Sequence, residues 1–214
     1  MSLFRSKFES ASSLIRSKWV AEAIDWAEVV VTSIIVVVIL FTFVFRVVGI
    51  DGPSMMNTLN SDYGKNPLDP GANSDMVVIS HLFYKPKVGD IVVVSRNVYN
   101  DETMEQTRSN QPIVKRTIAV GGDSVDIDPE GRVLVNGVEI SEPYIREPIA
   151  EGNRPSIDLP CVVGPGEVFL MGDNRNNSYD SRAIGPVDER YILGRVILRI
   201  FPLNKIKTFP NPNS

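Results

Sequence analysis

The chain has 214 residues, which is enough for one membrane segment and one domain of about 165 residues with its own core. Its net charge is −4, and beyond residue 46 it holds 17 basic and 22 acidic residues. An acidic domain without a basic cluster makes nucleic acid a poor partner. The single cysteine, Cys161, excludes an intramolecular disulfide, and the single His81 excludes zinc patterns that need two histidines.

Residues 1–26 carry apolar side chains three or four positions apart, from Phe4 to Trp26. This spacing predicts an amphipathic helix on the cytoplasmic surface of a membrane, with Trp19 and Trp26 at headgroup depth. A partly ordered polar tail is the alternative.

The stretch from Val29 to Phe45 contains no charge. Extended to residues 27–48, it makes about 33 Å of helix, enough to cross a bilayer. A buried core helix or a cleavable signal peptide is the alternative, but the run is too long for either pattern. Four Lys/Arg precede it and fewer follow closely, which predicts a single-pass signal anchor in the cell membrane. Its N-terminus is expected in the cytoplasm and residues 49–214 outside.

Beyond residue 75 the pattern predicts short strands. Candidate strands occur at 76–79, 91–94, 112–120, 168–171 and 192–201. Alternating apolar residues between 125 and 140, around the turns at 129–131 and 136–137, predict a hairpin meander. The polar stretches 60–74 and 95–112 and the proline-rich stretch 141–166 are expected to be loops. The sequence therefore predicts a mainly β domain with long loops after one N-terminal helix.

A turn directly after the apolar run holds the first candidate for chemistry. Gly52 permits backbone angles that other residues avoid, and Pro53 fixes φ immediately before Ser54. Both restrict the direction of the Ser54 hydroxyl. Most serines in such turns are turn residues only, so a nucleophile needs support from the rest of the chain.

With one histidine in the chain, a serine nucleophile needs another base unless His81 lies beside it. Lys115 stands in an apolar strand, next to Arg116. Strand alternation places the two on opposite faces, so one of them points inward unless both faces see solvent. A lysine in an apolar site has a lowered pKa and can act as a neutral base. A surface lysine is the alternative.

The third candidate segment, residues 172–182, is almost wholly polar and lies between two apolar strands. A solvated loop, a calcium loop and a hydrogen-bonded framework are all compatible with this composition. The EF-hand pattern fails, because Arg175 stands at its third position and Ser178 at the position that requires glycine.

Together these segments resemble the conserved boxes of type I signal peptidases, in the same order and spacing. The boxes are Ser54-Met55 through Thr58-Leu59; Val114-Lys115-Arg116 with Gly121-Gly122-Asp123; and Gly172-Asp173-Asn174 with Ser178, Asp180, Ser181, Arg182 and Gly185. Residues 87–93 are similar to another family box. The resemblance covers residues 29–200, and the single spanning segment resembles the Gram-positive type.

The resemblance implies a membrane-anchored serine endopeptidase that removes signal peptides from exported preproteins and needs no metal or cofactor. It implies Ser54 as the nucleophile, Lys115 as the general base, and Ser178 as the hydrogen-bond partner of the lysine amine. Asp180 and Arg182 are implied to support that loop. Shallow pockets for small side chains are expected from the residues that flank the dyad in sequence: Met55, Leu59 and Val114. Besides signal peptides and lipid, the secretion machinery is an open candidate partner.

Two departures from the family pattern stand beside the nucleophile. Asn57 occupies the place of the usual proline, three residues after Ser54. Gly52 replaces a serine that in some relatives contributes a hydroxyl to the oxyanion hole, so the backbone N–H of Ser54 is the expected donor here. A self-cleaving Ser/Lys repressor is a rival that the spanning segment disfavours. An inactive membrane-bound binding module is a second rival, and the intact set Ser54, Lys115 and Ser178 argues against it.

Overall fold

The structure is a computed structural model that describes residues 2–50, 52–60, 74–82, 84–95 and 112–210, and only the backbone for residues 2–17 and Phe43. The chain divides into two compact units, Met1–Val44 and Phe45–Ser214. The first unit is one helix, and the second contains all the described strands.

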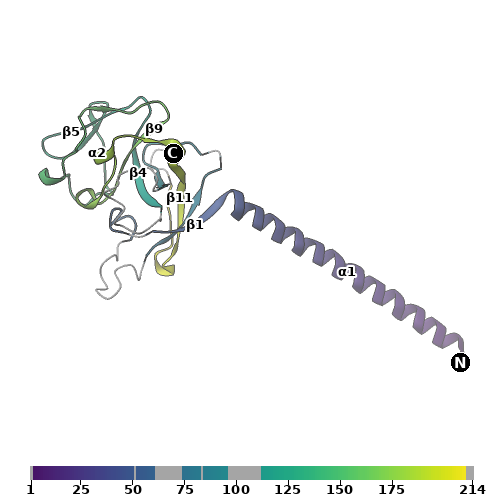
Figure 1. The fold of residues 1–214 in the computed structure, drawn as a ribbon. Coiled ribbons are helices and arrows are strands. Elements are labelled where there is room, and N and C mark those ends of the chain that lie inside the picture. The colour runs from purple at the N-terminus through teal and green to yellow at the C-terminus, as the bar shows by residue number, and fades with distance from the viewer. Residues whose placement is uncertain (1, 51, 61–73, 83, 96–111, 211–214) are drawn as a thin grey trace. The chain divides into compact units, whose positions relative to one another are not determined.

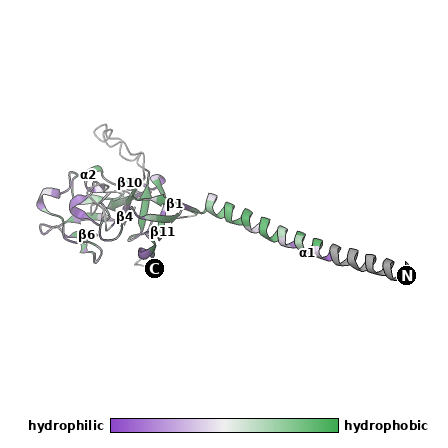
Figure 2. Cartoon of the chain, turned by 90° about the horizontal axis from the view of Figure 1, so that it is seen from below, coloured by the Kyte–Doolittle hydropathy of each residue, from purple (hydrophilic) through white to green (hydrophobic). Residues whose placement is uncertain are grey.

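Helix α1 runs without a break from Ser2 to Phe43. Its part Lys18–Thr42 is long and apolar enough to cross a membrane, and none of its most apolar window is buried by other parts of the chain. Apolar residues follow one another along this part of the helix (Figure 2). In lipid a helix satisfies its own backbone hydrogen bonds, which is why such a segment is helical despite its many β-branched residues.

The expected end of the spanning helix at Val48 was wrong. The helix ends at Phe43, and strand β1 (Phe45–Gly49) follows almost at once, paired in antiparallel register with β2 (Met76–Ser80). The β-branched residues Val47 and Val48 suit a strand, and the partner β2 supplies the hydrogen bonds that the helix would otherwise provide. The division predicted at Trp26 does not appear in the backbone, because the helix is continuous there.

The second unit is mainly β and is built from two sheets (Figure 1). The larger has the order β1-β2-β11-β3-β4-β9-β10, with β12 paired to β11; the smaller has the order β7-β6-β5-β8. The further strands are β3 (Ile91–Val94), β4 (Ile113–Val120), β5 (Ser124–Ile127), β6 (Val133–Val135), β7 (Val138–Glu139), β8 (Cys161–Val162), β9 (Glu167–Met171), β10 (Val187–Asp188), β11 (Ile192–Phe201) and β12 (Lys207–Thr208). Short helices are α2 (Ser181–Ile184) and the 3-10 turns Glu151–Asn153, Arg175–Asn177, Glu189–Tyr191 and Leu203–Lys205.

The mainly β fold and each of the predicted strands are confirmed. The meander 125–140 forms β5, β6 and β7. The sequence did not predict the two-residue strands β8, β10 and β12. The loops expected at 60–74 and 95–112 lie almost wholly outside the described residues.

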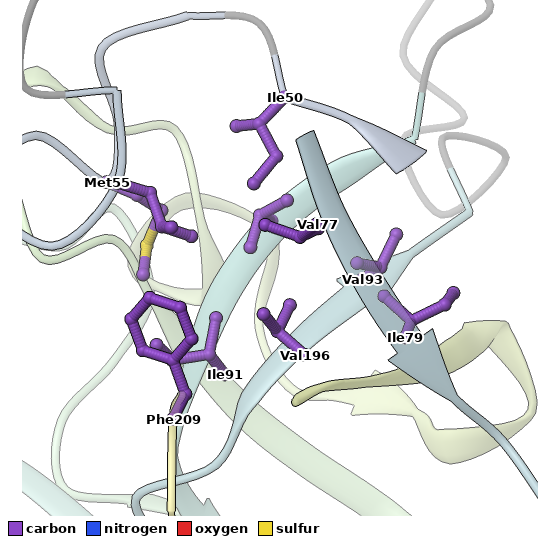
Figure 3. Close-up of a cluster of buried hydrophobic side chains, with 10 residues drawn as sticks. Ile50, Met55, Val77, Ile79, Ile91, Val93, Val196 and Phe209 are labelled. Atoms are coloured by element: carbon purple, nitrogen blue, oxygen red, sulfur yellow. The ribbon is translucent and has the colours of Figure 1, made fainter. Parts of the chain in front are cut away.

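Three clusters of buried apolar side chains make up the core of this unit. One of them joins Met55 and Leu59, which follow Ser54, to side chains of β2, β3, β4 and β11. In Figure 3 the Met55 side chain points toward the ring of Phe209, beside Ile91. The apolar residues after Ser54 therefore anchor its turn in the core.

Strand β4 lies between β3 and β9 and is buried over nearly its whole length. Lys115 is paired with Val92, and Arg116 is paired with Ile91. The two basic residues consequently lie on opposite faces of a strand that is covered on both sides.

Candidate active site

Ser54 lies in a tight turn formed by residues 52–60. The N–H of Met56 donates to the Pro53 carbonyl at 2.9 Å, and the N–H of Leu59 donates to the Met55 carbonyl at 2.8 Å. Gly52 has φ 96° and Asn57 has φ 88°. Positive φ suits glycine and is tolerated by asparagine, whereas proline is locked near −65°. Asn57 therefore stands where the backbone excludes the proline that the family usually has.

Asn60 fastens the C-terminal end of this turn. Its amide nitrogen Nδ2 donates to the carbonyls of Ile50 (2.9 Å) and Gly52 (3.2 Å), and its Oδ1 accepts from the N–H of Asp75 at 2.8 Å. The Asp75 carboxylate is paired in turn with Arg199 at 2.8 Å. The two ends of the turn are thus tied together before the serine is positioned.

The segment that begins at Gly172 holds the turn from the other side. The N–H of Asn174 donates to the Ser54 carbonyl at 3.0 Å, and Asn174 Nδ2 donates to the Pro53 carbonyl at 3.0 Å. A Cβ at Gly172 would lie 2.3 Å from Ser178 Oγ and 2.5 Å from the Ser54 carbonyl oxygen. No real Cβ tolerates such contacts, so Gly172 is required by the close approach of these two serines.

Lys115 is buried, with 4% of its surface exposed. Burial lowers the pKa of Lys115 to about 8, against the opposing effect of the Asp180 carboxylate. Arg182 adds to the lowering, and Asp173 opposes it. An amine with this pKa is neutral in a useful fraction of molecules near neutral pH, so the surface-lysine alternative is wrong and Lys115 can accept a proton.

Asp180 and Arg182 form a buried ion pair. Arg182 Nε donates to Asp180 Oδ1 at 2.8 Å, and the second carboxylate oxygen accepts the N–H of Gly172 at 2.9 Å. Burial alone would raise the pKa of Asp180, but the Arg182 guanidinium holds it below its usual range. Asp180 therefore stays ionised while it fixes the backbone next to Ser54.

Arg116 is also buried, on the opposite face of β4 from Lys115. It makes a two-pronged pair with Asp173, at 2.8 and 2.7 Å, and the Thr58 hydroxyl donates to the same carboxylate. Arg182, and not the sequence neighbour Arg116, is the arginine that contributes to the lowered pKa of Lys115. Arg116 is paired with Asp173 on the other side of the strand.

The three segments converge on the Ser54 turn, but the hydrogen bonds expected between the candidate catalytic side chains are not formed. In the described part of the chain, no hydrogen bond joins Ser54 Oγ to Lys115 Nζ. Ser178 Oγ is buried and has no hydrogen-bond partner, so the expected bond to the lysine amine is not formed in this structure. Catalytic contacts are often longer before a substrate binds.

The expected pocket residues Met55, Leu59 and Val114 pack in one cluster and are between 0% and 3% exposed. They contribute to the core, and their role toward a substrate stays a prediction. Two cavities of about 470 and 400 Å³ lie nearby and share Gly89, Pro143 and Tyr144, but neither is lined by Ser54 or Lys115. Among the described residues, no group of three or more His, Cys, Asp or Glu side chains is arranged to hold a metal ion.

Glu142 is a buried part of this network that the sequence did not reveal. It lies in the proline-rich stretch predicted only as a loop, yet the two terminal nitrogens of the Arg175 guanidinium donate to its carboxylate. Within that stretch, the sequence feature that distinguishes Glu142 is the tripeptide Glu142-Pro143-Tyr144, in which an acidic residue lies two positions before an aromatic one.

Comparisons with known proteins identify the family of this chain. The model of the family described as signal peptidase, peptidase S26, matches residues 23–201. Signal peptidase I of Leptolyngbya laminosa is 33% identical over 187 residues, which cover 85% of this chain and 81% of that protein. Probable signal peptidase I-1 of Synechocystis sp. is 35% identical over 142 residues, which cover 64% of this chain and 66% of that protein. A crystal structure of a signal peptidase I from Enterococcus faecalis V583 is 26% identical, covers 52% of this chain and 97% of that one, and has a TM-score of 0.36. The family model spans most of the chain, and the chain therefore belongs to the signal peptidase family, peptidase S26.

Proposed function

We propose that this signal peptidase cuts exported preproteins by an acyl-enzyme mechanism in which Ser54 is the nucleophile and Lys115 the general base. The observation that carries the proposal is the buried Lys115, whose pKa is lowered to about 8 by its surroundings. A lysine at its ordinary pKa of about 10.4 would be protonated near neutral pH and could not accept the serine proton. A buried lysine beside the loop that contacts Ser54 is the pattern that this chemistry needs.

The reaction begins with attack of Ser54 Oγ on the scissile carbonyl while the proton passes to Lys115 Nζ. The resulting tetrahedral oxyanion accepts a hydrogen bond from the backbone N–H of Ser54. The lysine then protonates the leaving amine, which gives an acyl-enzyme and releases the mature protein. A water molecule, deprotonated by Lys115, hydrolyses the ester and frees the signal peptide.

Gly52 supports the backbone part of this oxyanion hole. Its φ of 96° fixes the start of the turn, and the Ser54 carbonyl is already held by Asn174, so the adjacent peptide planes are constrained. Loss of one such donor typically costs about 3 kcal/mol of transition-state stabilisation. A rigid turn is therefore part of the proposed chemistry as well as of the fold.

The proposed substrates are signal peptides with small residues at the first and third positions before the cut. Met55, Leu59 and Val114 lie in one apolar cluster around the turn and would form shallow walls there. Helix α1 is proposed to anchor the enzyme in the cell membrane, with its N-terminus in the cytoplasm and the β unit outside. Contact with the secretion machinery remains a further prediction.

Cleavage of a model preprotein by the full chain tests the mechanism. Ser54→Ala should abolish cleavage with little effect on stability, and Lys115→Arg should be inactive because a guanidinium never deprotonates in this pH range. Ser124→Ala, in the smaller sheet, is the matched control and should cleave like the native chain. Native turnover by either Ser54→Ala or Lys115→Arg would refute the Ser/Lys mechanism.

A further inference from the structure

We propose that Glu142 is a positioning residue for the cleavage reaction. Together with Tyr144 it forms a strap, residues 142–144, that holds the Gly172-Asp173 segment against the Ser54 turn. This inference rests on the proposed Ser54/Lys115 mechanism and adds a residue that the family boxes in this sequence do not contain.

The first contact of the strap is the ion pair between Glu142 and Arg175. Arg175 NH1 donates to Glu142 Oε2 at 2.8 Å, and NH2 donates to Oε1. The side chains are 6% and 1% exposed, so the pair is shielded from water and from salt. Glu142 and Arg175 are 33 positions apart, so this pair fastens two distant loops together.

Arg175 connects this ion pair to the backbone of Gly172, which lies against Ser54. Its Nε donates to the Gly172 carbonyl at 3.1 Å, and its own carbonyl accepts from Arg182 NH1 at 2.7 Å. Gly172 is the residue at which the Ser54 carbonyl and the Ser178 side chain approach most closely. The guanidinium can keep this geometry only while a buried carboxylate fixes its plane.

Tyr144 supplies the second contact of the strap. Its hydroxyl donates to Glu142 Oε1 at 3.0 Å, and the Arg116 guanidinium lies over its ring at 3.8 Å. Arg116 binds the Asp173 carboxylate, which also accepts the Thr58 hydroxyl of the serine turn. The strap is therefore connected to Gly172 through Arg175 and to Asp173 through Arg116.

The effect on catalysis is geometric. The pKa of Lys115 is set by burial and by the charges of Asp180, Arg182 and Asp173. Glu142 is not among these groups. Loss of the strap should loosen the loop that carries Ser178 and grips Ser54 while the basicity of Lys115 is retained. A misplacement of about 1 Å at reacting groups can lower a rate about a hundredfold.

The test measures preprotein cleavage by the full chain in detergent for Glu142→Gln, with Glu147→Gln as the control from the same loop. Glu147 is exposed, whereas Glu142 is buried against Arg175. Glu142→Gln keeps the size of the side chain but places an N–H₂ group or a neutral oxygen against the guanidinium. Because loss of a buried partner also lowers stability, each rate is measured well below that variant's unfolding midpoint and per folded molecule.

We expect kcat of Glu142→Gln to fall roughly tenfold to a hundredfold, with KM and the midpoint of the pH profile unchanged. Glu142→Asp keeps the charge and should recover part of the lost rate, while Glu147→Gln should match the native chain. Native kcat per folded Glu142→Gln molecule would overturn the inference, and so would a shifted pH midpoint that accounts for the whole loss. If Ser54→Ala also cleaved, the proposed mechanism itself would fail, a result distinct from failure of the strap alone.

Discussion

At the scale of single residues, Lys115 combines a functional asset with a structural cost. The shift of its pKa from 10.5 to about 8 corresponds to about 3 kcal/mol in favour of the neutral amine. In the unfolded chain the same lysine would still hold its proton above pH 8. The free energy of unfolding should therefore rise as the pH increases between these two values, because the unfolded state binds more protons.

The pH dependence of cleavage follows from the same residue. The neutral amine is the base, so kcat/KM should rise with pH and level off above an apparent pKa of about 8. Below that value the rate should fall about tenfold per pH unit, because the protonated amine cannot accept the serine proton. Initial rates across a pH series give the midpoint. A rising limb centred above pH 10 would mean that Lys115 is not buried in the working enzyme.

The candidate pair could be predicted from the sequence because its members stand in constrained places, in the order of the signal peptidase boxes. Ser54 follows a Gly-Pro turn, and Lys115 interrupts an apolar strand. The burial of both Lys115 and Arg116 could not be predicted, because period-two alternation shows only that the two lie on opposite faces. The groups over the two faces come from distant parts of the chain, because Asp180 and Arg182 lie near Lys115 while Asp173 and Tyr144 lie against Arg116.

At the scale of elements, the 52–60 turn contains three residues with positive φ: Gly52, Asn57 and Asn60. At Gly52 an added Cβ would meet nothing within 4 Å, so the backbone angle requires glycine there. Asn57 also has positive φ, but it carries a side chain. For such a residue a left-handed backbone conformation costs about 1 to 2 kcal/mol. The departure from the family proline is thus a change in the shape of the turn.

Substitutions at Asn57 test this interpretation. Asn57→Pro should destabilise the β unit by about 3 kcal/mol or more and impair cleavage, because proline cannot adopt φ 88°. Asn57→Gly should keep the native thermal midpoint or raise it slightly, since glycine adopts this angle freely. Thermal unfolding and cleavage rates of the two variants provide the comparison. An Asn57→Pro variant as stable as the native chain would show that the turn has another conformation.

The strand β1 and the strap show what local patterns leave out. Val47 and Val48 continue the apolar run of the preceding helix, so hydropathy alone cannot show where the helix ends. The position of β2 determines where the helix ends, since β1 pairs with that strand. Glu142 owes its burial to Arg175, 33 positions later, and no period in a proline-rich stretch encodes such a contact.

At the scale of the whole molecule, the chain joins an apolar helix to a β unit with its own core. All the clusters of buried apolar residues lie within the described part of Phe45–Ser214, whereas the large side chains described on α1, such as Trp26 at 71%, are exposed. Exposed apolar surface of this extent supports the proposed membrane anchor.

Removal of residues 1–44 should separate the stability of the β unit from binding to the membrane. The chain that begins at Phe45 should unfold cooperatively near the midpoint of the full chain and stay in the supernatant when vesicles are sedimented. The full chain should sediment with them. Other exposed apolar residues, among them Leu203 at 74% and Ile206 at 58%, offer a second route to lipid. Sedimentation of the shortened chain to the same extent would assign membrane binding to such residues instead of α1.

The buried ion pairs around Gly172 affect the range of ionic strength in which the enzyme can work. On the outer face of a membrane, where we propose that the β unit lies, no cell controls the ionic strength. Counter-ions weaken exposed charge pairs over a Debye length of about 10 Å at 0.1 M salt but barely reach groups excluded from water. Asp173, Asp180 and Glu142 are each at most 6% exposed and each is matched by an arginine. We therefore expect the loop held by these pairs to keep its geometry when the salt concentration outside the cell changes.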